Sequence, residues 1–590
     1  MRISSRVDSV ENSMNTVSRK FVPAKFDSSD WTQIEPLFTE LSNRQLKSVA
    51  DLEKWLADYS ELVCVTDEYG SRRYIDKTCH TDDAEVEKAF MHWVENIEPK
   101  MKPLYFALQK KFVSSPFRES LKGDRYEMLT RSWLADIEVF RAENVALETE
   151  STKLINDYDK INGALLIDFR GETYTLQQMQ RFVEEPDRQT REEAWTLIAN
   201  KRLNHREDFD RLYDGLIGIR AKIAKNAGFK DYRDYSNRQR KRFDYGPEQC
   251  NQFADAVEKS VVPFIRKMNE KRRELLKVDK LRPWDMNVDP LNRTPLRPFD
   301  PKDINGFVAK TRETFDRLSP QLAKDFDNLS NNHNLDLDSR KGKAPGGYQS
   351  SLHESKQPFI FMNAAGVHRD VETMLHEGGH AFHYLWTAEV EPLVFLRHAP
   401  IEFCEVASMG MELLTLEHYD VFYKDPSHFR RAKIQQLEGN VRVLAWVATI
   451  DQFQHWVYTH PNHTRDERTK HWRSLVERFG DNLDWTGHEA ARDAMWHRQL
   501  HLYHEPFYYI EYAIAQLGAL QLWLRSRQDL KATMSSYRHA LTLGGTRTLP
   551  ELFKQCGIVF EFSNKTIEPL IKSVADEIQS LDAEDESKAA

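Results

Sequence analysis

The segment Asp370–Leu385 combines residue types and spacing that suit metal-dependent hydrolysis. It reads DVETMLHEGGHAFHYL, in which His376, Glu377 and His380 form an HExxH pattern. Residues four apart lie on one face of an α-helix, so both imidazoles can reach one metal ion. Zinc bound there would lower the pKa of a water from about 15.7 towards 7, and Glu377 could take its proton and pass it to the leaving amine. The pattern therefore predicts a hydrolytic zinc site.

A hydrolytic zinc site needs a third protein ligand and one open position. Glu405 lies 25 residues after His380, in the helical pattern IEFCEVASMGMELLTLEHY. A carboxylate facing inward among apolar side chains is costly to bury unless it is paired or binds metal. A solvated acidic face is the alternative, and it fits Glu402 and Glu417 better than Glu405. Glu412 shares a face with Glu405 and is a candidate to orient a ligating imidazole.

Two further features of this segment bear on the site. Gly378 and Gly379 each cost the helix about 1 kcal/mol relative to alanine, which suggests that another backbone or a substrate approaches closely. His383 lies on a similar face to His376. We interpret His383 as a packing or orienting residue, since a fourth ligand would close the site.

Helices dominate the elements that must position these residues. A cap at Asn226-Ala227-Gly228 should end one of them. Apolar residues recur at helical spacing in Asp51–Tyr59, Asp82–Ile97, Arg191–Asn226 and Asn251–Lys277.

Three segments depart from this helical pattern. The stretch Ala164–Leu176 alternates and predicts a strand or hairpin, and Leu281–Pro301 predicts a long proline-rich loop. A strand is expected at Pro358–Met362, where its edge could accept an extended peptide. Gly346 and Gly347 precede Tyr348 and would allow a substrate to come close to the backbone.

Length and composition indicate a globular protein of more than one unit. The chain has 590 residues, 23 glycines, 23 prolines and a net charge of −9, with no basic block. Neither a nucleic-acid nor a membrane partner is expected. We expect a helical N-terminal domain over residues 1–200, a catalytic domain over 201–580 and a disordered acidic tail over 581–590.

The expected location is cytoplasmic. The N-terminal segment has no apolar run that suits a signal peptide, and no stretch approaches the ~18 apolar residues of a membrane span. The cysteines are odd in number and form no CxxC, which suits buried thiols in a reducing compartment. They are Cys64, Cys79, Cys250, Cys404 and Cys556.

Several segments together resemble one family of enzymes. They are HEGGHAFH, EVASMGMELL, RKGKAPGGY, PFIFMN, HLYHEPFYYIEYAIAQLGAL and LGGTRTLPELF. In this order they resemble the oligoendopeptidase F and thimet oligopeptidase family of zinc metallopeptidases, from roughly residue 190 to 575. The stretch PFYYIEYA is closer to the oligoendopeptidase F branch, because the corresponding loop of the thimet branch is rich in glycine.

The resemblance implies a mainly α fold and a peptidase activity. Two helical halves would enclose a deep substrate channel with zinc at its floor, and a small β-sheet would lie beside the active-site helix. Such a channel admits short unfolded oligopeptides and excludes folded proteins, so the implied enzyme is an endopeptidase. One Zn²⁺ per chain would be held by His376, His380 and Glu405, with Glu377 as general base and later acid.

The resemblance also implies hydrogen-bond donors for the oxyanion that develops on the peptide carbonyl. These are best matched by His501, Tyr509 and Tyr512. The spacing departs by about one residue from the thimet pattern, so Tyr508 and His504 remain candidates. Any one of these tyrosines could instead be a core aromatic.

Other interpretations stay open from the sequence alone. His497, His501 and His504 have helical spacing and could form a second metal site, although Pro506 ends any such helix nearby. The protein could be a related zinc exopeptidase (a dicarboxypeptidase or a carboxypeptidase), which would need a cation for the substrate's C-terminus. It could also be a peptide-binding relative that has lost turnover.

Overall fold

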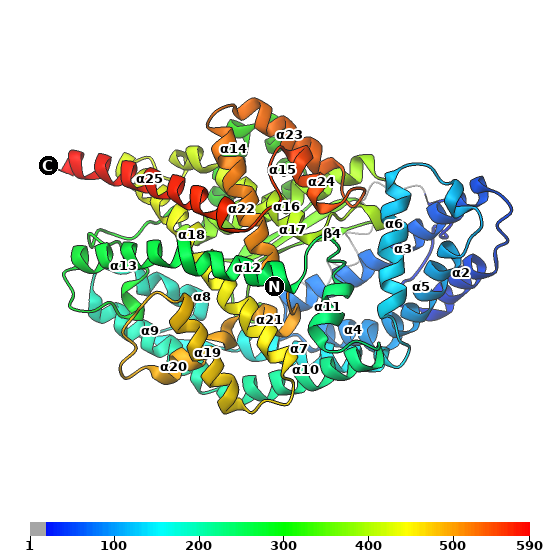
Figure 1. Cartoon of the computed structure of the whole chain (residues 1–590), viewed down its shortest axis with the longest axis horizontal. Coiled ribbons are helices and arrows are strands. Elements are labelled where there is room, and N and C mark those ends of the chain that lie inside the picture. The colour runs from blue at the N-terminus through cyan, green and yellow to red at the C-terminus, as the bar shows by residue number, and fades with distance from the viewer. Residues whose placement is uncertain (1–18, 590) are drawn as a thin grey trace, which may run out of the picture.

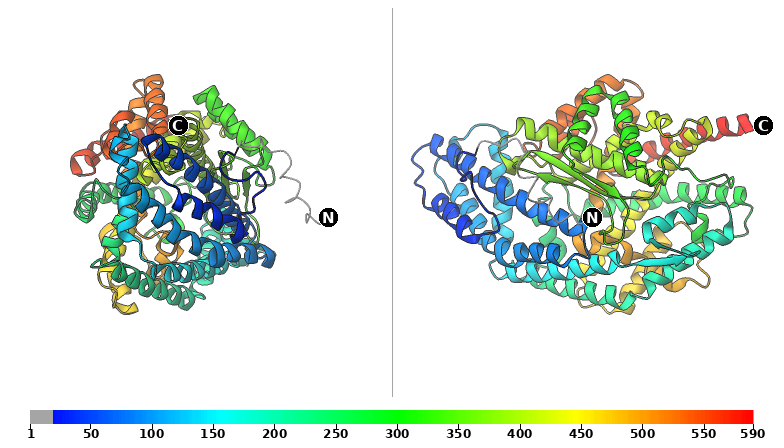
Figure 2. Two further views of the ribbon diagram at one scale, coloured as in Figure 1. Left: turned by 90° about the vertical axis from the view of Figure 1, so that its right-hand side faces the viewer. Right: turned by 180° about the vertical axis from the view of Figure 1, so that it is seen from behind.

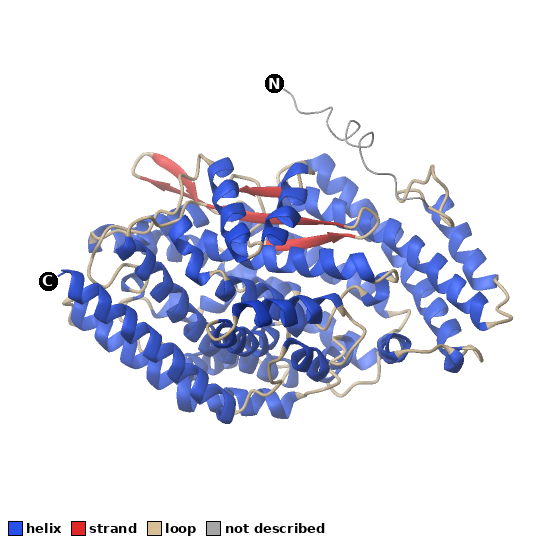
Figure 3. Cartoon of the chain, turned by 90° about the horizontal axis from the view of Figure 1, so that it is seen from above, coloured by secondary structure: helices blue, strands red, loops and turns tan. Residues whose placement is uncertain are grey.

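The computed structural model describes residues 19–589, and only the backbone of residues 584–589. Helices make up most of the molecule, and the few strands gather at one side (Figures 1 and 3). Short 3₁₀ or π segments connect the helices at Trp93–Ile97, Arg118–Ser120, Gln180–Glu184, Val257–Val261, Pro283–Asp285, Val394–Leu396, Leu416–Val421 and Met495–Arg498.

The N-terminal part is a set of helices around its own apolar core. That core takes in buried side chains between Val22 and Trp133, together with the short segment Leu393–Leu396. The helices of this core are α2 (Trp31–Asn43), α3 (Val49–Cys79), α4 (Ala84–His92), α5 (Glu98–Val113) and α6 (Asp124–Val139). The next helix, α7 (Asn144–Gly163), packs on the main core through Tyr158. The main core takes in buried side chains from Val139 onwards. The change from one apolar core to the other therefore occurs well before residue 200. The boundary near residue 200 stays a prediction.

In the middle of the chain the predicted hairpin is confirmed, and one predicted helix is found to be two. Strands β1 (Leu166–Phe169) and β2 (Glu172–Thr175) pair antiparallel. The single helix expected up to Asn226 is two helices, α9 (Arg188–Leu203) and α10 (Arg206–Asn226). Residues 204–208 are all polar, so no buried side chain holds the helix across the turn. Gly228 then follows α10 with φ +83°, as the predicted cap requires.

The remaining helices before the sheet are short or interrupted. The segment Leu281–Pro301 is a loop apart from one 3₁₀ turn, as predicted. The helices are α8 (Leu176–Met179), α11 (Tyr232–Gln239), α12 (Pro247–Ala256), α13 (Val262–Leu276), α14 (Ile304–Leu318) and α15 (Pro320–Asn331).

A three-stranded sheet precedes the HExxH helix. Its order is β3 (Leu335–Asp338), β5 (Gln357–Ala364), β4 (Tyr348–Leu352), with β5 parallel to β3 and antiparallel to β4. The expectation that the 358–362 strand offers a free edge is wrong, because β5 is the central strand. Its side chains from 358 to 362 are all buried, which suits a strand covered on both faces. The edge nearest the HExxH helix is β4.

Helix α16 (His368–Val390) follows β5 and leads into the C-terminal helices. They are α17 (Ile401–Leu414), α18 (Pro426–Thr459), α19 (Arg465–Phe479), α20 (Glu489–Asp493), α21 (Leu500–His504), α22 (Tyr509–Ser526), α23 (Leu530–Thr542), α24 (Leu549–Cys556) and α25 (Asn564–Ala589). Because α25 extends to Ala589, the described part of the acidic tail is helical rather than disordered. Residue 590 lies outside the described residues.

The two halves of the molecule face one another across a cavity. The right-hand view of Figure 2 shows the sheet and the HExxH helix above an arc of helices that runs from α7 to α10. Side chains of α3 and α7 line the same cavity as those of α16, α17 and α22. The expected mainly α architecture of two helical halves with a small sheet is confirmed. All five cysteines are free and buried. Within residues 19–589, no helix is both long and apolar enough to cross a membrane.

Candidate metal centre and substrate cleft

The start of α16 is fixed by one carboxylate. Oδ2 of Asp370 accepts hydrogen bonds from the backbone N–H groups of Ala365, Gly366 and Val367, over 2.7 to 2.9 Å. These groups would otherwise be unpaired at the helix N-terminus. The anchored first turn sets which face of α16 carries the HExxH side chains.

A glycine brings α16 and α17 into backbone contact. A Cβ on Gly379 would lie 2.5 Å from the carbonyl oxygen of Ala407 and 2.6 Å from Cα of Ser408. A Cβ on Gly378 would lie 2.6 Å from the ring of Phe315. The inference of a close backbone approach is confirmed for Gly379, whereas Gly378 makes room for a side-chain ring. The contact places the middle of α17 directly beside the two histidines of α16.

Three side chains of the predicted ligand set converge there. The ligand atoms of His376, His380 and Glu405 all lie within 4.8 Å of one another. Oε2 of Glu405 is 3.3 Å from Nε2 of His376 and 3.4 Å from Nε2 of His380. Glu405 is only 1% exposed, so its charge requires a cationic partner. Two imidazole nitrogens and one carboxylate oxygen fit a zinc ion with one open position.

Further side chains orient this set. Glu412 lies 2.7 Å from Nδ1 of His376, which leaves Nε2 of that ring free to face Glu405. Gln436, on α18, donates to the other oxygen of Glu412 over 2.7 Å. Ser408 donates to Oε2 of Glu405 over 2.8 Å. The sequence indicated Glu412, whereas Gln436 has no signal in a sequence because it lies on a helix outside the motif.

Glu402 differs from its expected surface position. It is buried, and Oε1 accepts a hydrogen bond from the hydroxyl of Tyr245 over 2.6 Å. Glu417 is exposed and pairs with Lys433, as expected of a solvated acid. Burial of α17 on all sides explains the difference, since every residue of this helix from Glu402 to Leu414 is buried.

Glu377 has the environment of a candidate general base. It is 5% exposed, and its Oε2 has no hydrogen-bond partner among the described residues. Burial raises the pKa of Glu377 above its ordinary value, although His376 and His380 oppose the shift. A Cβ on Gly347 would lie 3.6 Å from Oε1 of Glu377, so this carboxylate faces the loop before the edge strand β4. An unpartnered carboxylate at this place can accept a proton from a group in the cavity.

Helices α21 and α22 and the loop between them bring in a histidine and two tyrosines. His501, Tyr508 and Tyr512 line the cavity. Nε2 of His501 is 3.0 Å from the hydroxyl of Tyr512, and the hydroxyl of Tyr508 donates to Oε1 of Glu405. Tyr509 is not among the lining residues; its ring packs 5.1 Å from His501 and 5.3 Å from Tyr512. The structure thus places Tyr508, rather than Tyr509, against the candidate ligands.

The three histidines of this segment do not converge on one point. His497 pairs with Asp210 at 3.2 Å, and His504 pairs with Asp159 at 2.8 Å. His501 faces Tyr512 instead. The alternative of a second metal bound by these three histidines therefore has no geometric support among the described residues.

Comparison with known proteins agrees with this architecture. The structure matches a solved "PZ peptidase A with inhibitor 2" with a TM-score of 0.90 and 28% identity, over 95% of this chain and 99% of that one. It matches a solved putative oligoendopeptidase F from Bacillus anthracis with a TM-score of 0.86 and 25% identity, over 95% and 99% of the two chains.

Curated relatives point to the same branch at lower identity. An oligoendopeptidase F homolog of Borreliella burgdorferi is 21% identical over 384 residues, which are 64% of this chain and 62% of that protein. The alignments to the curated relatives span from a quarter to about three fifths of those proteins' lengths.

The family models cover both halves of the chain. The model of the peptidase M3 N-terminal domain matches residues 21–140, and the model of peptidase family M3 matches residues 181–570. The second match alone spans most of the chain and includes all the candidate site residues described above. The chain belongs to peptidase family M3, on the side of the oligoendopeptidase F branch.

Proposed function

We propose that this protein is a zinc-dependent endopeptidase that hydrolyses internal peptide bonds of short unfolded oligopeptides. The observation that carries the proposal is the unpartnered carboxylate of Glu377 beside the His376, His380 and Glu405 set, inside a cavity between two helical halves. Membership of a peptidase family and the names of the relatives support the same reaction class.

The donor set supports zinc as the resident ion. Two imidazoles and one carboxylate are ligands that zinc accepts, and three protein ligands are the number found in hydrolytic sites. When bound, the ion would polarise the scissile carbonyl and lower the pKa of a water from about 15.7 to about 7. The ligands come from α16 and α17, and Glu412 holds the ring of His376 in place.

The protein's own residues would carry the proton transfers. Glu377 would take the proton of the attacking water and deliver it to the leaving amine. Tyr512 would donate a hydrogen bond to the oxyanion, and His501 would hold that hydroxyl in place. Tyr509 also belonged to the expected donor set; its packing on His501 and Tyr512 favours a supporting role.

The shape of the cleft supports a peptide substrate in extended form. Tyr348 and Gln349 of the edge strand β4 line the cavity beside Glu377. A strand edge offers backbone donors and acceptors to an extended peptide. A folded protein cannot present such an extended segment to the edge. Tyr74, Thr78 and Asp159 of the N-terminal helices line the same cavity, so the substrate would contact both halves.

Mass spectrometry of defined short peptides tests the proposal. The intact protein should make internal cuts that a chelator abolishes. Glu377→Gln should bind metal and lose most cuts, whereas Glu389→Gln, an exposed acid of the same helix, should cleave normally. Products shortened only by one or two terminal residues would instead establish an exopeptidase. Stoichiometric zinc without any hydrolysis would indicate a peptide-binding protein and overturn the proposal.

A further inference from the structure

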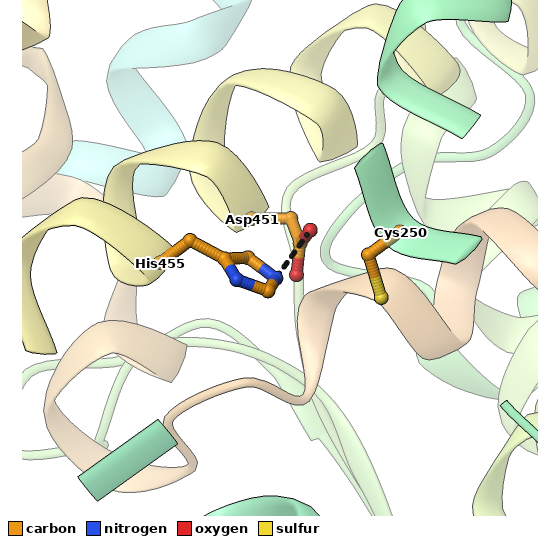
Figure 4. Close-up of side chains that lie close together, drawn as sticks. All are labelled: Cys250, Asp451 and His455. Atoms are coloured by element: carbon orange, nitrogen blue, oxygen red, sulfur yellow. Dashed lines mark ion pairs between the residues drawn. The ribbon is translucent and has the colours of Figure 1, made fainter. Parts of the chain in front are cut away.

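A second group of metal-ligating side chains lies between α12 and α18. Cys250 comes from α12, and Asp451 and His455 come from successive turns of α18 (Figure 4). The thiol sulfur, a carboxylate oxygen and an imidazole nitrogen lie within 4.8 Å of one another. None of the three residues lines the cavity that holds the HExxH site. The group is therefore separate from the site described above.

These side chains are buried without adequate partners. Asp451 is 1% exposed and Cys250 is 2% exposed. Neither carboxylate oxygen of Asp451 has a hydrogen-bond partner among the described residues, and the same holds for Nε2 of His455. Nε2 of His455 lies 3.2 Å from Oδ2 of Asp451, the contact marked in Figure 4, and Oδ1 of Asp451 has no partner in the described part of the chain. Buried polar groups are normally satisfied, so this carboxylate points to a missing cation.

We infer that Cys250, Asp451 and His455 bind a second divalent ion, with Zn²⁺ as the expected metal. A thiolate with an imidazole and a carboxylate is a donor set that zinc prefers, whereas Mg²⁺ and Ca²⁺ require oxygen ligands. The helical spacing of Asp451 and His455 lets both reach one ion, as in the HExxH pair. The ion would also neutralise the buried charge of Asp451.

Metal binding at this site requires that Cys250 lose its thiol proton. Burial raises the pKa of Cys250 well above its ordinary value, and the charge of Asp451 adds to the shift. The thiol is therefore protonated in the metal-free protein. Because only the thiolate is a ligand, metal binding would release this proton, and affinity should rise with pH.

The position of the group suggests a structural role. The ion would join α12 to α18 at the level of Phe507, whose ring packs 5.5 Å from that of His455. Phe507 has φ +64°, and its N–H donates to Gln454 over 2.6 Å. The next residue, Tyr508, donates to Glu405. A metal bound by His455 would thus brace the loop that carries tyrosines into the cleft.

Cobalt substitution of the intact protein distinguishes the two sites. The HExxH site contains no sulfur ligand, so a thiolate-to-cobalt charge-transfer band reports the Cys250 site alone. The metal-free protein, kept reduced, is titrated with Co²⁺, and bound cobalt is counted by elemental analysis. We expect two equivalents and the thiolate band. Cys250→Ala should keep one equivalent of cobalt and lose the thiolate band. Cys404→Ala should keep both equivalents and the band, because Cys404 lines the cavity of the HExxH site without being one of its candidate ligands.

The outcomes separate cleanly. A single equivalent without the band, or a band that survives Cys250→Ala, overturns the inference. Two equivalents without the band also overturn it, since the second ion then binds elsewhere. Circular dichroism checks that each variant is folded. If Cys250→Ala does not fold, two other variants test the proposal. His455→Gln must lose the second equivalent of cobalt, and Glu405→Ala must keep the thiolate band. Retention of both ions by His455→Gln would contradict the proposal.

Discussion

Gln499 and His501 are joined by a 2.8 Å hydrogen bond between the amide nitrogen and Nδ1 of the imidazole. The amide orientation follows from Trp446, whose indole N–H donates to the amide oxygen of Gln499 over 2.9 Å. Nδ1 of His501 must then accept, so its proton lies on Nε2, which faces the hydroxyl of Tyr512. That hydroxyl oxygen accepts from His501 and keeps its own hydrogen for the cleft.

Gln499→Leu should therefore impair turnover without touching the metal. The variant removes the donor that fixes the tautomer and the ring orientation of His501. We expect kcat to fall roughly 10-fold with little change in KM, as for other residues that orient a catalytic side chain. Trp446→Phe should act in the same direction, because the amide of Gln499 can then turn over. Steady-state kinetics on a fluorogenic peptide measure kcat and KM of both variants. A normal kcat in Gln499→Leu would show that Gln499 does not orient His501 for catalysis.

His501 should not contribute to the pH profile of the enzyme. Burial, followed by the charge of the nearby His504, lowers the pKa of His501 from 6.5 to about 3. A base with a lowered pKa is neutral at every pH above that value, so His501 is neutral through the whole working range. His501→Gln should lower kcat but leave the midpoint of the acid limb of kcat/KM unchanged. If His501 instead acted while protonated, wild-type activity would fall as pH rises past about 6.5.

Tyr512→Phe should lower kcat more than it raises KM. Burial, with the charge of Glu405, raises the pKa of Tyr512 well above its ordinary range, so the hydroxyl stays protonated and able to donate. Loss of one oxyanion donor costs about 10²–10³ in kcat in other hydrolases. Tyr509→Phe, on the same helix, keeps the ring that packs on His501 and Tyr512 and should lower kcat far less. An effect of Tyr512→Phe on KM alone would make it a substrate contact.

Glu412→Ala should weaken metal binding although Glu412 is not a ligand. Its contact with Nδ1 of His376 fixes the ring and increases the basicity of Nε2, and loss of such partners typically costs 10–100-fold in metal affinity. Competition with a chelator of known affinity measures the change. Glu417→Ala removes an exposed acid beyond the same helix and should bind metal normally. Equal metal affinities of the two variants would show that Glu412 does not support the metal ligands.

The sequence indicated which candidate site residues come together where one helix face determines this. The ligand role of Glu405 rested on the resemblance, and the roles of all these residues stay predictions. The histidines and Glu377 follow from spacing within α16, and Glu405 and Glu412 share one face of α17. The contributions of Gln436, Trp446 and Gln499 could not be predicted, because they depend on how α18 and the loop before α21 pack against these helices. Glu402 was misplaced for the same reason: its own helix has no exposed face. Local periodicity indicates which face of a helix is buried, but it does not indicate which residues pack against that face.

The fold shows the same division. A predominance of helices and the hairpin of β1 and β2 follow from hydrophobic pattern. The central position of β5 depends on pairing between strands that are separated in the chain, which an apolar run alone does not specify. The break between α9 and α10 shows that a helical pattern can continue through a turn when the polar residues between two helices fit either state.

Gly379→Ala should disrupt the metal centre through packing alone. The added methyl would meet the backbone of Ala407 and Ser408 at 2.5–2.6 Å, so α16 and α17 would have to separate. Overpacking of this kind costs about 1–3 kcal/mol, and separation moves Glu405 away from the histidines. We expect lower stability in chemical denaturation and weaker metal binding together. Gly439→Ala, at an exposed position of α18 with no atom within 4 Å of the new Cβ, should be neutral or stabilising by about 0.5–1 kcal/mol. Normal metal affinity in a destabilised Gly379→Ala variant would show that the helix contact does not position Glu405.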